Sequence, residues 1–303
     1  MTTGVGINVP QDVTRDGYAA QLIDFVDAAV AHGYDSLWVS ESLKSDVVDP
    51  LAVLNFLAAR TSDVRLGVAV MISGLRSPLR LAREVASLDQ LSAGRCIVGV
   101  GVGNDRADYA PHGIDPGHRG RHFEAGVRVL RDLLTHEQVS DKTPWWHLEH
   151  EPRPLRTVQR PAPPIWFGAR AREALRRAVR LGDGWVGAGS MSQGDFLRAL
   201  DEVRIALDAQ DRDPGTFAIA KRVYVHLTDT PDPPDAVRRW FSHHYGTSRR
   251  IEDVFVIGGA DQIVQHLGEL RTAGVGTLIL HPVVDVRPQM EMLADDVVPQ
   301  LGG

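Results

Sequence analysis

Residues Val64–Ile72 read VRLGVAVMI, a nearly continuous apolar run that contains four β-branched residues. Such a run is typical of a strand that is buried on both faces of a parallel sheet. Helical patterns flank it, one at Pro50–Arg60 and one at Ser77–Leu91. Strands that alternate with helices pair in parallel through crossover connections. The sequence around this run therefore indicates an α/β fold.

The same alternation continues in both directions along the chain. Eight strands are predicted, at Gly4–Val9, Ser36–Ser40, Val64–Ile72, Cys96–Val100, Ile165–Gly168, Trp185–Val186, Ala218–Leu227 and Thr277–Leu280. Eight strand–helix units are what a closed (β/α)8 or TIM barrel needs, whereas the alternative, an open doubly wound sheet, normally has fewer strands. We therefore predict one TIM barrel domain over residues 1–303.

Two connections are longer than the two to six residues that are usual in such folds. The first, Gly101–Gly120, follows the fourth strand, and the second, His136–Pro164, precedes the fifth. Long barrel loops often form lids or substrate-binding walls. The alternative is that they are surface loops without a binding role. The sequence thus predicts insertion loops after strand 4 and before strand 5.

Charge and hydropathy exclude several classes of partner. The net charge of −6 argues against an extended nucleic-acid-binding surface, which needs clustered positive charge. The longest apolar stretches are far shorter than the ~20 residues of a membrane helix. The first residues, MTTGVGINVP, lack the basic and then apolar pattern of a signal peptide, and a single cysteine, Cys96, cannot form an intrachain disulfide. We expect a cytoplasmic protein without nucleic-acid or membrane partners.

Common catalytic motifs are absent from the sequence. Gly99–Arg106 reads GVGVGNDR, but Asn104 stands where a dinucleotide-binding loop needs its third glycine or alanine. No Walker A loop and no Gly-x-Ser-x-Gly elbow occurs. His136-Glu137 lacks the second histidine of a zinc-protease helix. We therefore predict no metal site.

Four segments carry a resemblance to a known family. They are GYDSLWVSES (33–42), VRLGVAVMISGLRSPLRLAREVASLDQLSAGRCIVGVGVGN (64–104), PPIWFGARAREALRRAVRLGDGWVGAG (163–189) and FVIGGADQIVQHLGELRTAGVGTLIL (255–280). In this order and spacing they resemble the luciferase-like monooxygenase family. The resemblance implies a TIM barrel that binds a flavin or the deazaflavin F420 at the C-terminal ends of its strands. The segment around strand 4 is similar to the F420-dependent branch, and an arginine-rich composition fits the GC-rich genomes in which F420 is abundant.

The resemblance also implies positions for the cofactor. In the family, strand 3 carries a non-proline cis peptide behind the ring system, and the matching residues are Ala69 and Val70. Gly168-Ala169-Arg170 ends a strand and opens a helix, where backbone N–H groups and a fixed positive charge can hold a phosphate. Gly187-Ala188-Gly189 ends the next strand, where small residues permit close approach to the same phosphate. Ordinary turns and a solvated arginine are the alternatives.

Few polar residues are candidates for contact with the ring system of the cofactor. Glu41 stands where the family commonly has an acidic residue close to the cofactor, and Asn104 follows strand 4, where it can contact the ring or act as a turn residue. Ser42 and Asn104 stand where the sugar-phosphate dehydrogenase branch has its catalytic histidine and glutamate, which argues against that activity. Glu41, Tyr109 and His112 are therefore the candidate proton donors, the last two being loop residues otherwise.

These observations predict an F420-dependent oxidoreductase that transfers a hydride between the deazaflavin C5 and a small organic substrate, in the reductive direction. An FMN-dependent monooxygenase and a non-catalytic flavin-binding protein are the alternatives, because both rings use one scaffold. The family usually dimerises through early barrel helices, and the apolar positions of Pro50–Arg60 and Ser77–Leu91 fit that use. We expect a homodimer, which a monomer mass by light scattering would contradict.

Overall fold

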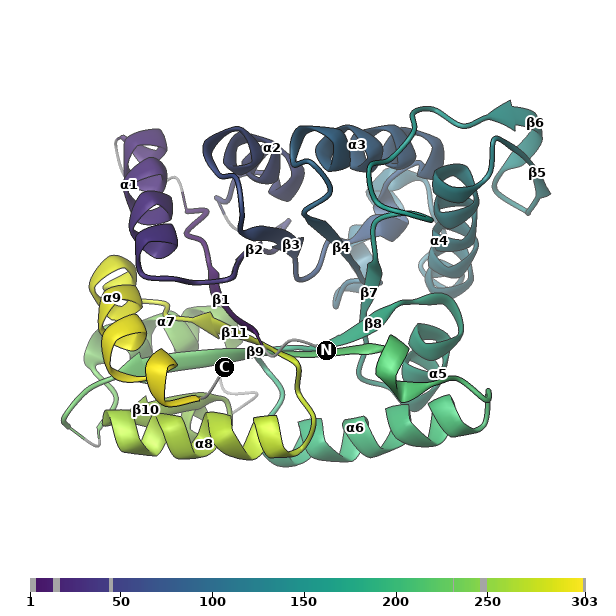
Figure 1. The fold of residues 1–303 in the computed structure, drawn as a ribbon. Helices are drawn as coiled ribbons and strands as arrows, with labels where there is room; N and C mark the ends of the chain where they lie inside the picture. The colour runs from purple at the N-terminus through teal and green to yellow at the C-terminus, as the bar shows by residue number, and fades with distance from the viewer. Residues whose placement is uncertain (1–3, 13–16, 44–45, 231, 246–249, 302–303) are drawn as a thin grey trace.

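Eight parallel strands close into a barrel in the computed structural model, which describes residues 4–12, 17–43, 46–230, 232–245 and 250–301 (Figure 1). The barrel strands are β1 (Gly4–Asn8), β2 (Ser36–Val39), β3 (Arg65–Val68), β4 (Cys96–Val100), β7 (Ile165–Gly168), β8 (Gly184–Gly187), β9 (Ala218–Leu227) and β11 (Thr277–His281). Pairing of β1 with β11 and of β8 with β9 closes the ring. The predicted TIM barrel is therefore confirmed.

Helices surround the ring of strands (Figure 1). They are α1 (Tyr18–Ala31), α2 (Pro50–Arg60), α3 (Pro78–Leu91), α4 (Arg119–Thr135), α5 (Arg172–Leu181), α6 (Gln193–Asp208), α7 (Asp235–Tyr245), α8 (Ala260–Thr272) and α9 (Val286–Asp296). Local sequence explains where several of them begin. Asp49 caps α2 by accepting hydrogen bonds from the backbone N–H groups of Leu51 and Ala52, and Pro50 takes the first helical position.

Two apolar layers hold the barrel together. The larger layer lies between the strands and the helices, and the smaller one fills the barrel interior. Trp38 of β2 and Trp166 of β7 stack inside the barrel with their ring centroids 5.5 Å apart. Inward-facing residues thus form a packed plug below the C-terminal ends of the strands, where barrel active sites lie.

Three strands were not predicted. The loop predicted over His136–Pro164 contains an antiparallel hairpin of β5 (Gln138–Lys142) and β6 (His147–Pro152), which projects beside α4 (Figure 1). In addition, β10 (Phe255–Gly258) pairs with the second half of β9. Of the helices that the structure describes, none combines the length and hydropathy that a bilayer crossing requires.

Candidate functional site

Polar side chains face inward at the C-terminal mouth of the barrel. Ala220 on β9 and Ile279 on β11 belong to the apolar interior. Because side chains on a strand alternate between its two faces, Arg222, Tyr224 and His281 point to the same side, two or four residues closer to the mouth. We call these three residues the mouth cluster.

Buried polar atoms gather in this region without hydrogen-bond partners. Within the described part of the chain, the Nε of Arg222, the Nδ1 of His281 and the Oδ1 of nearby Asn8 on β1 lack one. Burial lowers the pKa of His281 well below its usual value, and the charges of Arg222 and His244 lower it further, so this imidazole is neutral. A buried polar atom without a partner is rare in folded proteins and needs an explanation, of which ligand binding is one.

The mouth cluster is joined to the end of β3. The Ala69–Val70 peptide bond is cis, as the resemblance implies. The carbonyl oxygen of Ala69 accepts a hydrogen bond from Nη1 of Arg222 at 3.3 Å. On the other side of this bulge, a Cβ added to Gly168 would lie 2.8 Å from Cγ2 of Val70, so a glycine is needed for this approach. The structure thus brings Ala69, Val70 and Gly168 together.

Aromatic rings fix the position of Tyr224. Its ring stacks on Phe255 with centroids 5.1 Å apart and contacts the rings of Trp240 at 5.2 Å and His281 at 5.0 Å. Its hydroxyl lies 2.8 Å from the hydroxyl of Tyr245 on α7. The phenol is therefore held in one orientation by α7, β10 and β11, with its oxygen next to a second hydroxyl.

A buried lysine supports the loop after β8. Lys221 is 3% exposed, and its Nζ donates hydrogen bonds to the carbonyl oxygens of Ala188 at 2.6 Å and Met191 at 3.1 Å. Burial, with smaller contributions from the charges of Arg222 and Arg170, lowers the pKa of Lys221 to about 7. Lys221 therefore fixes the backbone of the predicted residues Gly187-Ala188-Gly189 through its hydrogen bond to Ala188. A Cβ on Gly189 would lie 2.7 Å from the ring of Tyr224.

The N-terminus of α5 can hold an anion. Its N-cap residue, Ala171, provides no side-chain hydrogen bond, so side-chain capping does not satisfy the first backbone N–H groups of the helix. Arg170 directly precedes it and is half exposed, with Nη2 3.4 Å from Oδ2 of Asp195. Gly168, Ala169 and Arg170 thus lie where a phosphate would meet a helix dipole and a cation.

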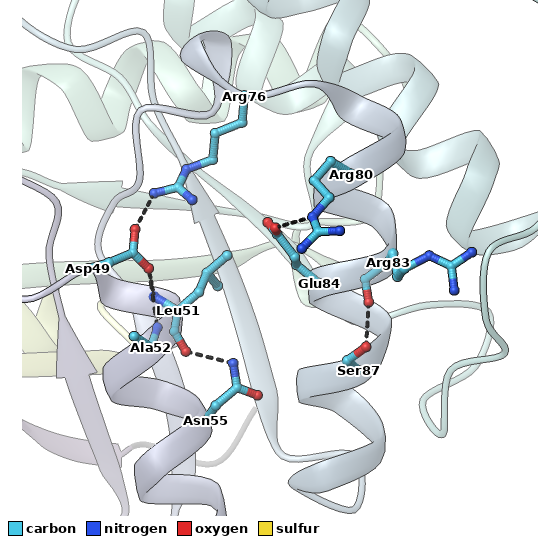
Figure 2. A pocket seen from close by; sticks show the side chains of 9 residues that line it. All are labelled: Asp49, Leu51, Ala52, Asn55, Arg76, Arg80, Arg83, Glu84 and Ser87. Carbon is cyan, nitrogen blue, oxygen red and sulfur yellow. Dashed lines mark hydrogen bonds and ion pairs between the residues drawn. The ribbon is translucent and has the colours of Figure 1, made fainter.

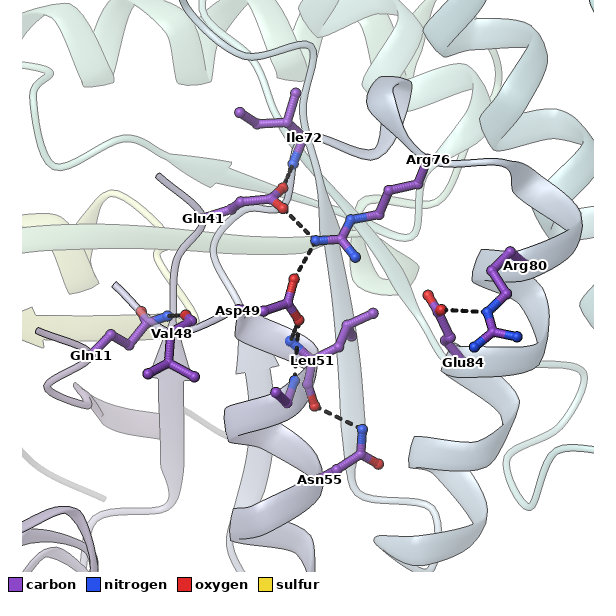
Figure 3. Close-up of polar contacts among 11 residues, drawn as sticks. Gln11, Glu41, Val48, Asp49, Leu51, Asn55, Ile72, Arg76, Arg80 and Glu84 are labelled. Atoms are coloured by element: carbon purple, nitrogen blue, oxygen red, sulfur yellow. Dashed lines mark hydrogen bonds and ion pairs between the residues drawn. The ribbon is translucent and has the colours of Figure 1, made fainter. Parts of the chain in front are cut away.

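Glu41 lies at the rim of the barrel in an ion-pair network (Figure 3). Its carboxylate accepts hydrogen bonds from the backbone N–H of Ile72 and from the guanidinium of Arg76, which also contacts Oδ2 of Asp49 at 2.7 Å. Its backbone N–H lies 3.4 Å from the carbonyl oxygen of Val70. Glu41 is therefore next to the bulge, but both of its carboxylate oxygens are already engaged.

A shallow hollow of about 480 Å³ lies between α2 and α3 (Figure 2). Arg76, Arg80, Arg83 and Glu84 line much of it, and Arg80 forms an ion pair with Glu84 at 2.9 Å. None of the residues predicted to bind cofactor or substrate lines this hollow. It is separate from the mouth cluster and shares Arg76 and Asp49 with the network around Glu41.

The structure places the remaining predicted residues on the loop after β4. Asn104 and His112 are exposed there. Tyr109 is 0% exposed, its hydroxyl donates to the carbonyl oxygen of Val102 at 2.6 Å, and burial raises its pKa to about 12. Tyr109 therefore anchors the loop through its hydroxyl.

The sequence reasoning did not identify the mouth cluster. Residues 222–226 read RVYVH, so polar side chains at 222, 224 and 226 alternate with valines. In a closed barrel one face of each strand points to the interior, so this alternation was a usable signal. The prediction for this stretch is a strand, with no role for its polar side chains.

Comparison with known proteins places these features in a family. Residues 2–297 match the sequence profile of the family described as luciferase-like monooxygenase. A phthiodiolone/phenolphthiodiolone dimycocerosates ketoreductase from Mycobacterium sp. (strain JLS) is 27% identical, and the match covers 98% of this chain and 87% of that protein. The protein of the same name from Mycobacterium kansasii is 30% identical over 62% of this chain and 58% of its own length.

Solved structures share the fold at lower sequence identity. An F420-dependent secondary alcohol dehydrogenase in complex with an F420-acetone adduct superposes with a TM-score of 0.85, 16% identity and full coverage of both chains. The monooxygenase RslO1 from Streptomyces bottropensis has a TM-score of 0.81, 21% identity and full coverage of both chains. From the profile match over nearly its whole length, the chain belongs to the luciferase-like monooxygenase family.

Proposed function

We propose that the protein is an F420-dependent oxidoreductase that reduces the carbonyl group of an apolar organic substrate. The observation that carries the proposal is the mouth cluster, where the guanidinium of Arg222 and the phenol of Tyr224 lie beside the bulge at Ala69-Val70. These side chains offer hydrogen-bond donors at the place where a barrel enzyme binds its substrate. The ketoreductase names of two relatives point to the same class of reaction.

The residues present fit a phosphate-bearing deazaflavin. The N-terminus of α5 has no side-chain cap, and Arg170 stands next to it, so the two can hold the phosphate. Gly187-Ala188-Gly189 can approach the same group with its backbone. The bulge at Ala69-Val70 can support the ring system. Asn104 follows the C-terminal end of β4, from where its side chain can contact the edge of the ring system. When bound, the cofactor supplies a hydride from its C5.

The chain itself would orient the substrate. Arg222 has a buried Nε without a partner in the described residues, so the guanidinium can donate to a carbonyl oxygen at little cost in lost protein contacts. The rings of Trp240 and Phe255 form an apolar wall next to Tyr224. A ketone with apolar substituents satisfies both surfaces, because it presents one acceptor to Arg222 and hydrocarbon to the rings.

Two binding titrations and one reaction test the proposal. F420 and FMN are titrated in parallel against the protein while its tryptophan fluorescence is recorded, and we expect F420 to bind at least tenfold more tightly. Reduced F420 is then mixed anaerobically with 2-octanone or cyclohexanone, and the absorbance of oxidised F420 should return. FMN binding alone, with oxygen consumed by the reduced FMN complex, would instead indicate the monooxygenase alternative. Binding of F420 without reaction would indicate a flavin-binding protein.

A further inference from the structure

Reduction of a ketone needs a proton as well as a hydride, and the structure limits which side chain can provide it. The carboxylate of Glu41 is engaged by Arg76 and by the backbone of Ile72. The hydroxyl of Tyr109 donates to a backbone carbonyl inside its own loop. His112 is exposed on that loop. None of the three candidates from the sequence thus presents a free acidic proton to the barrel interior.

Tyr224 presents such a proton. Its ring faces the interior, it is clamped by Phe255, Trp240 and His281, and its oxygen lies 3.5 Å from Nη2 of Arg222. A cation beside a phenol oxygen stabilises the phenolate that remains after the proton leaves. His281 is neutral, so it adds no competing charge at this point.

The neighbouring hydroxyl gives the phenol a route to solvent. The hydroxyl groups of Tyr224 and Tyr245 are 2.8 Å apart, which is an ordinary O–H···O distance. Tyr245 is the last residue of α7 and is partly exposed, whereas Tyr224 is buried. A proton can therefore pass from water through Tyr245 to Tyr224.

We propose that Tyr224 is the proton donor of the carbonyl reduction, that Tyr245 returns the proton to it, and that Arg222 stabilises the intermediate phenolate. The inference rests on the proposed function. When bound, the reduced deazaflavin would supply the hydride for the new C–H bond, and the π electrons of the carbonyl would move onto its oxygen. That oxygen takes the proton of Tyr224, the phenolate takes the proton of Tyr245, and Tyr245 regains one from water. The proton that the cofactor releases after losing its hydride would pass to water and balance the proton taken up by Tyr245, so the products are the alcohol and the oxidised cofactor.

The test compares Tyr224→Phe with the wild type in anaerobic single turnovers of reduced F420 with excess 2-octanone. We expect the rate to fall by about 100-fold, since a positioned general acid contributes roughly 10²–10⁴. Tyr245→Phe should show a smaller fall, because water can replace it. A solvent isotope effect on the wild-type rate should disappear in Tyr224→Phe. The matched control is Tyr34→Phe, whose hydroxyl donates to the backbone of Met290 outside the mouth cluster.

Binding measurements separate chemistry from structure. The dissociation constants for F420 and for 2-octanone, both followed by tryptophan fluorescence, should stay within about twofold in Tyr224→Phe. If its rate also stays within about threefold of the wild type, Tyr224 is not the donor, and the proposed function stands. If ketone or F420 binding is lost with the rate, Tyr224 has a binding or structural role and the inference fails. If the wild type reduces neither 2-octanone nor cyclohexanone, the proposed function fails and the inference with it.

Discussion

Two polar side chains at opposite ends of the barrel differ in how completely their hydrogen bonds are made. At the N-terminal end, Asp89 in the last turn of α3 is 0% exposed, and its carboxylate accepts hydrogen bonds from the backbone N–H groups of Val158 and Gln159 and from Nε2 of Gln159, at 2.5–3.0 Å. At the C-terminal end, Arg222 has only two long contacts, at 3.3 and 3.5 Å, and a buried Nε without a partner in the described residues. A polar group whose hydrogen bonds are all made is saturated and stabilises the fold. A polar group that keeps unused donors is undersaturated and can donate to a ligand.

The largest expected effect is at the saturated end. Asp89→Ala removes the buried carboxylate that accepts three partly buried N–H hydrogen bonds, so we expect the free energy of unfolding to fall by about 4 kcal/mol. Urea denaturation measures this change. Asp208→Ala, at an exposed position of α6, is the matched control and should change stability by less than about 0.5 kcal/mol. A small loss in Asp89→Ala would mean that the segment 157–161 is not held by this carboxylate.

Lys221 lies between the saturated and the undersaturated case. Its Nζ donates to two carbonyl oxygens, and among the described residues no carboxylate accepts from it. Burial lowers its folded-state pKa to about 7, below the unfolded value of 10.5. Between these values the unfolded state binds more protons, so stability should rise with pH by at most about 1.4 kcal/mol per unit. Below pH 7 both states are protonated and the contribution is constant.

Lys221→Met should remove this slope. The measurement is the difference in unfolding free energy between the variant and the wild type at pH 6.5 and at pH 9. The exposed Lys142→Met is the control and should show no change of that difference with pH. An equal difference at both pH values for Lys221→Met would show that the amine titrates normally despite its burial.

At the undersaturated end we expect function and stability to separate. Arg222→Met removes a partly buried cation with few hydrogen bonds, so the free energy of unfolding should change by less than about 1 kcal/mol. Ketone reduction should fall about 100-fold, because the substrate oxygen and the Tyr224 phenolate lose their cationic partner. Urea denaturation and single-turnover kinetics measure the two effects. A loss of several kcal/mol in stability with unchanged turnover would show that Arg222 belongs to the structural group.

The sequence predicted the barrel strands because most of them are short apolar runs, and burial on both faces leaves that signature in the residues themselves. It did not predict β5 and β6, whose sequences QVSDK and HLEHEP are polar and gain strand geometry only by pairing with each other. The short β10 likewise depends on its pairing with β9. Local pattern cannot specify such partners.

For the candidate site, the resemblance supplied positions but not their contacts. It implied Glu41 near the cofactor, yet Glu41 is bound by Arg76, 35 residues further along the chain. It implied the bulge at Ala69-Val70, which the structure contains, but not that Arg222 contacts it from the opposite side of the barrel. The first contact joins the segments that follow the neighbouring strands β2 and β3, and the second crosses the barrel from β9 to β3, so both depend on the tertiary fold rather than on any local pattern.

The smallest effect concerns Arg170, which stands between the two cases because it is 47% exposed and paired with Asp195 at 3.4 Å. If Arg170 donates a charge-assisted hydrogen bond to the phosphate, Arg170→Ala should weaken F420 binding by about tenfold. The effect is smaller than the full value of such a bond, because Arg170 gives up its ion pair with Asp195 when the cofactor binds. Asp195→Asn should tighten binding, because it frees the guanidinium. The control is Arg176→Ala on α5 itself, which has the same exposure as Arg170 and a partner of its own in Glu173. Titrations at fixed ionic strength decide the matter: equal weakening in both arginine variants would mean that the general charge of α5 attracts the cofactor and that Arg170 makes no specific contact.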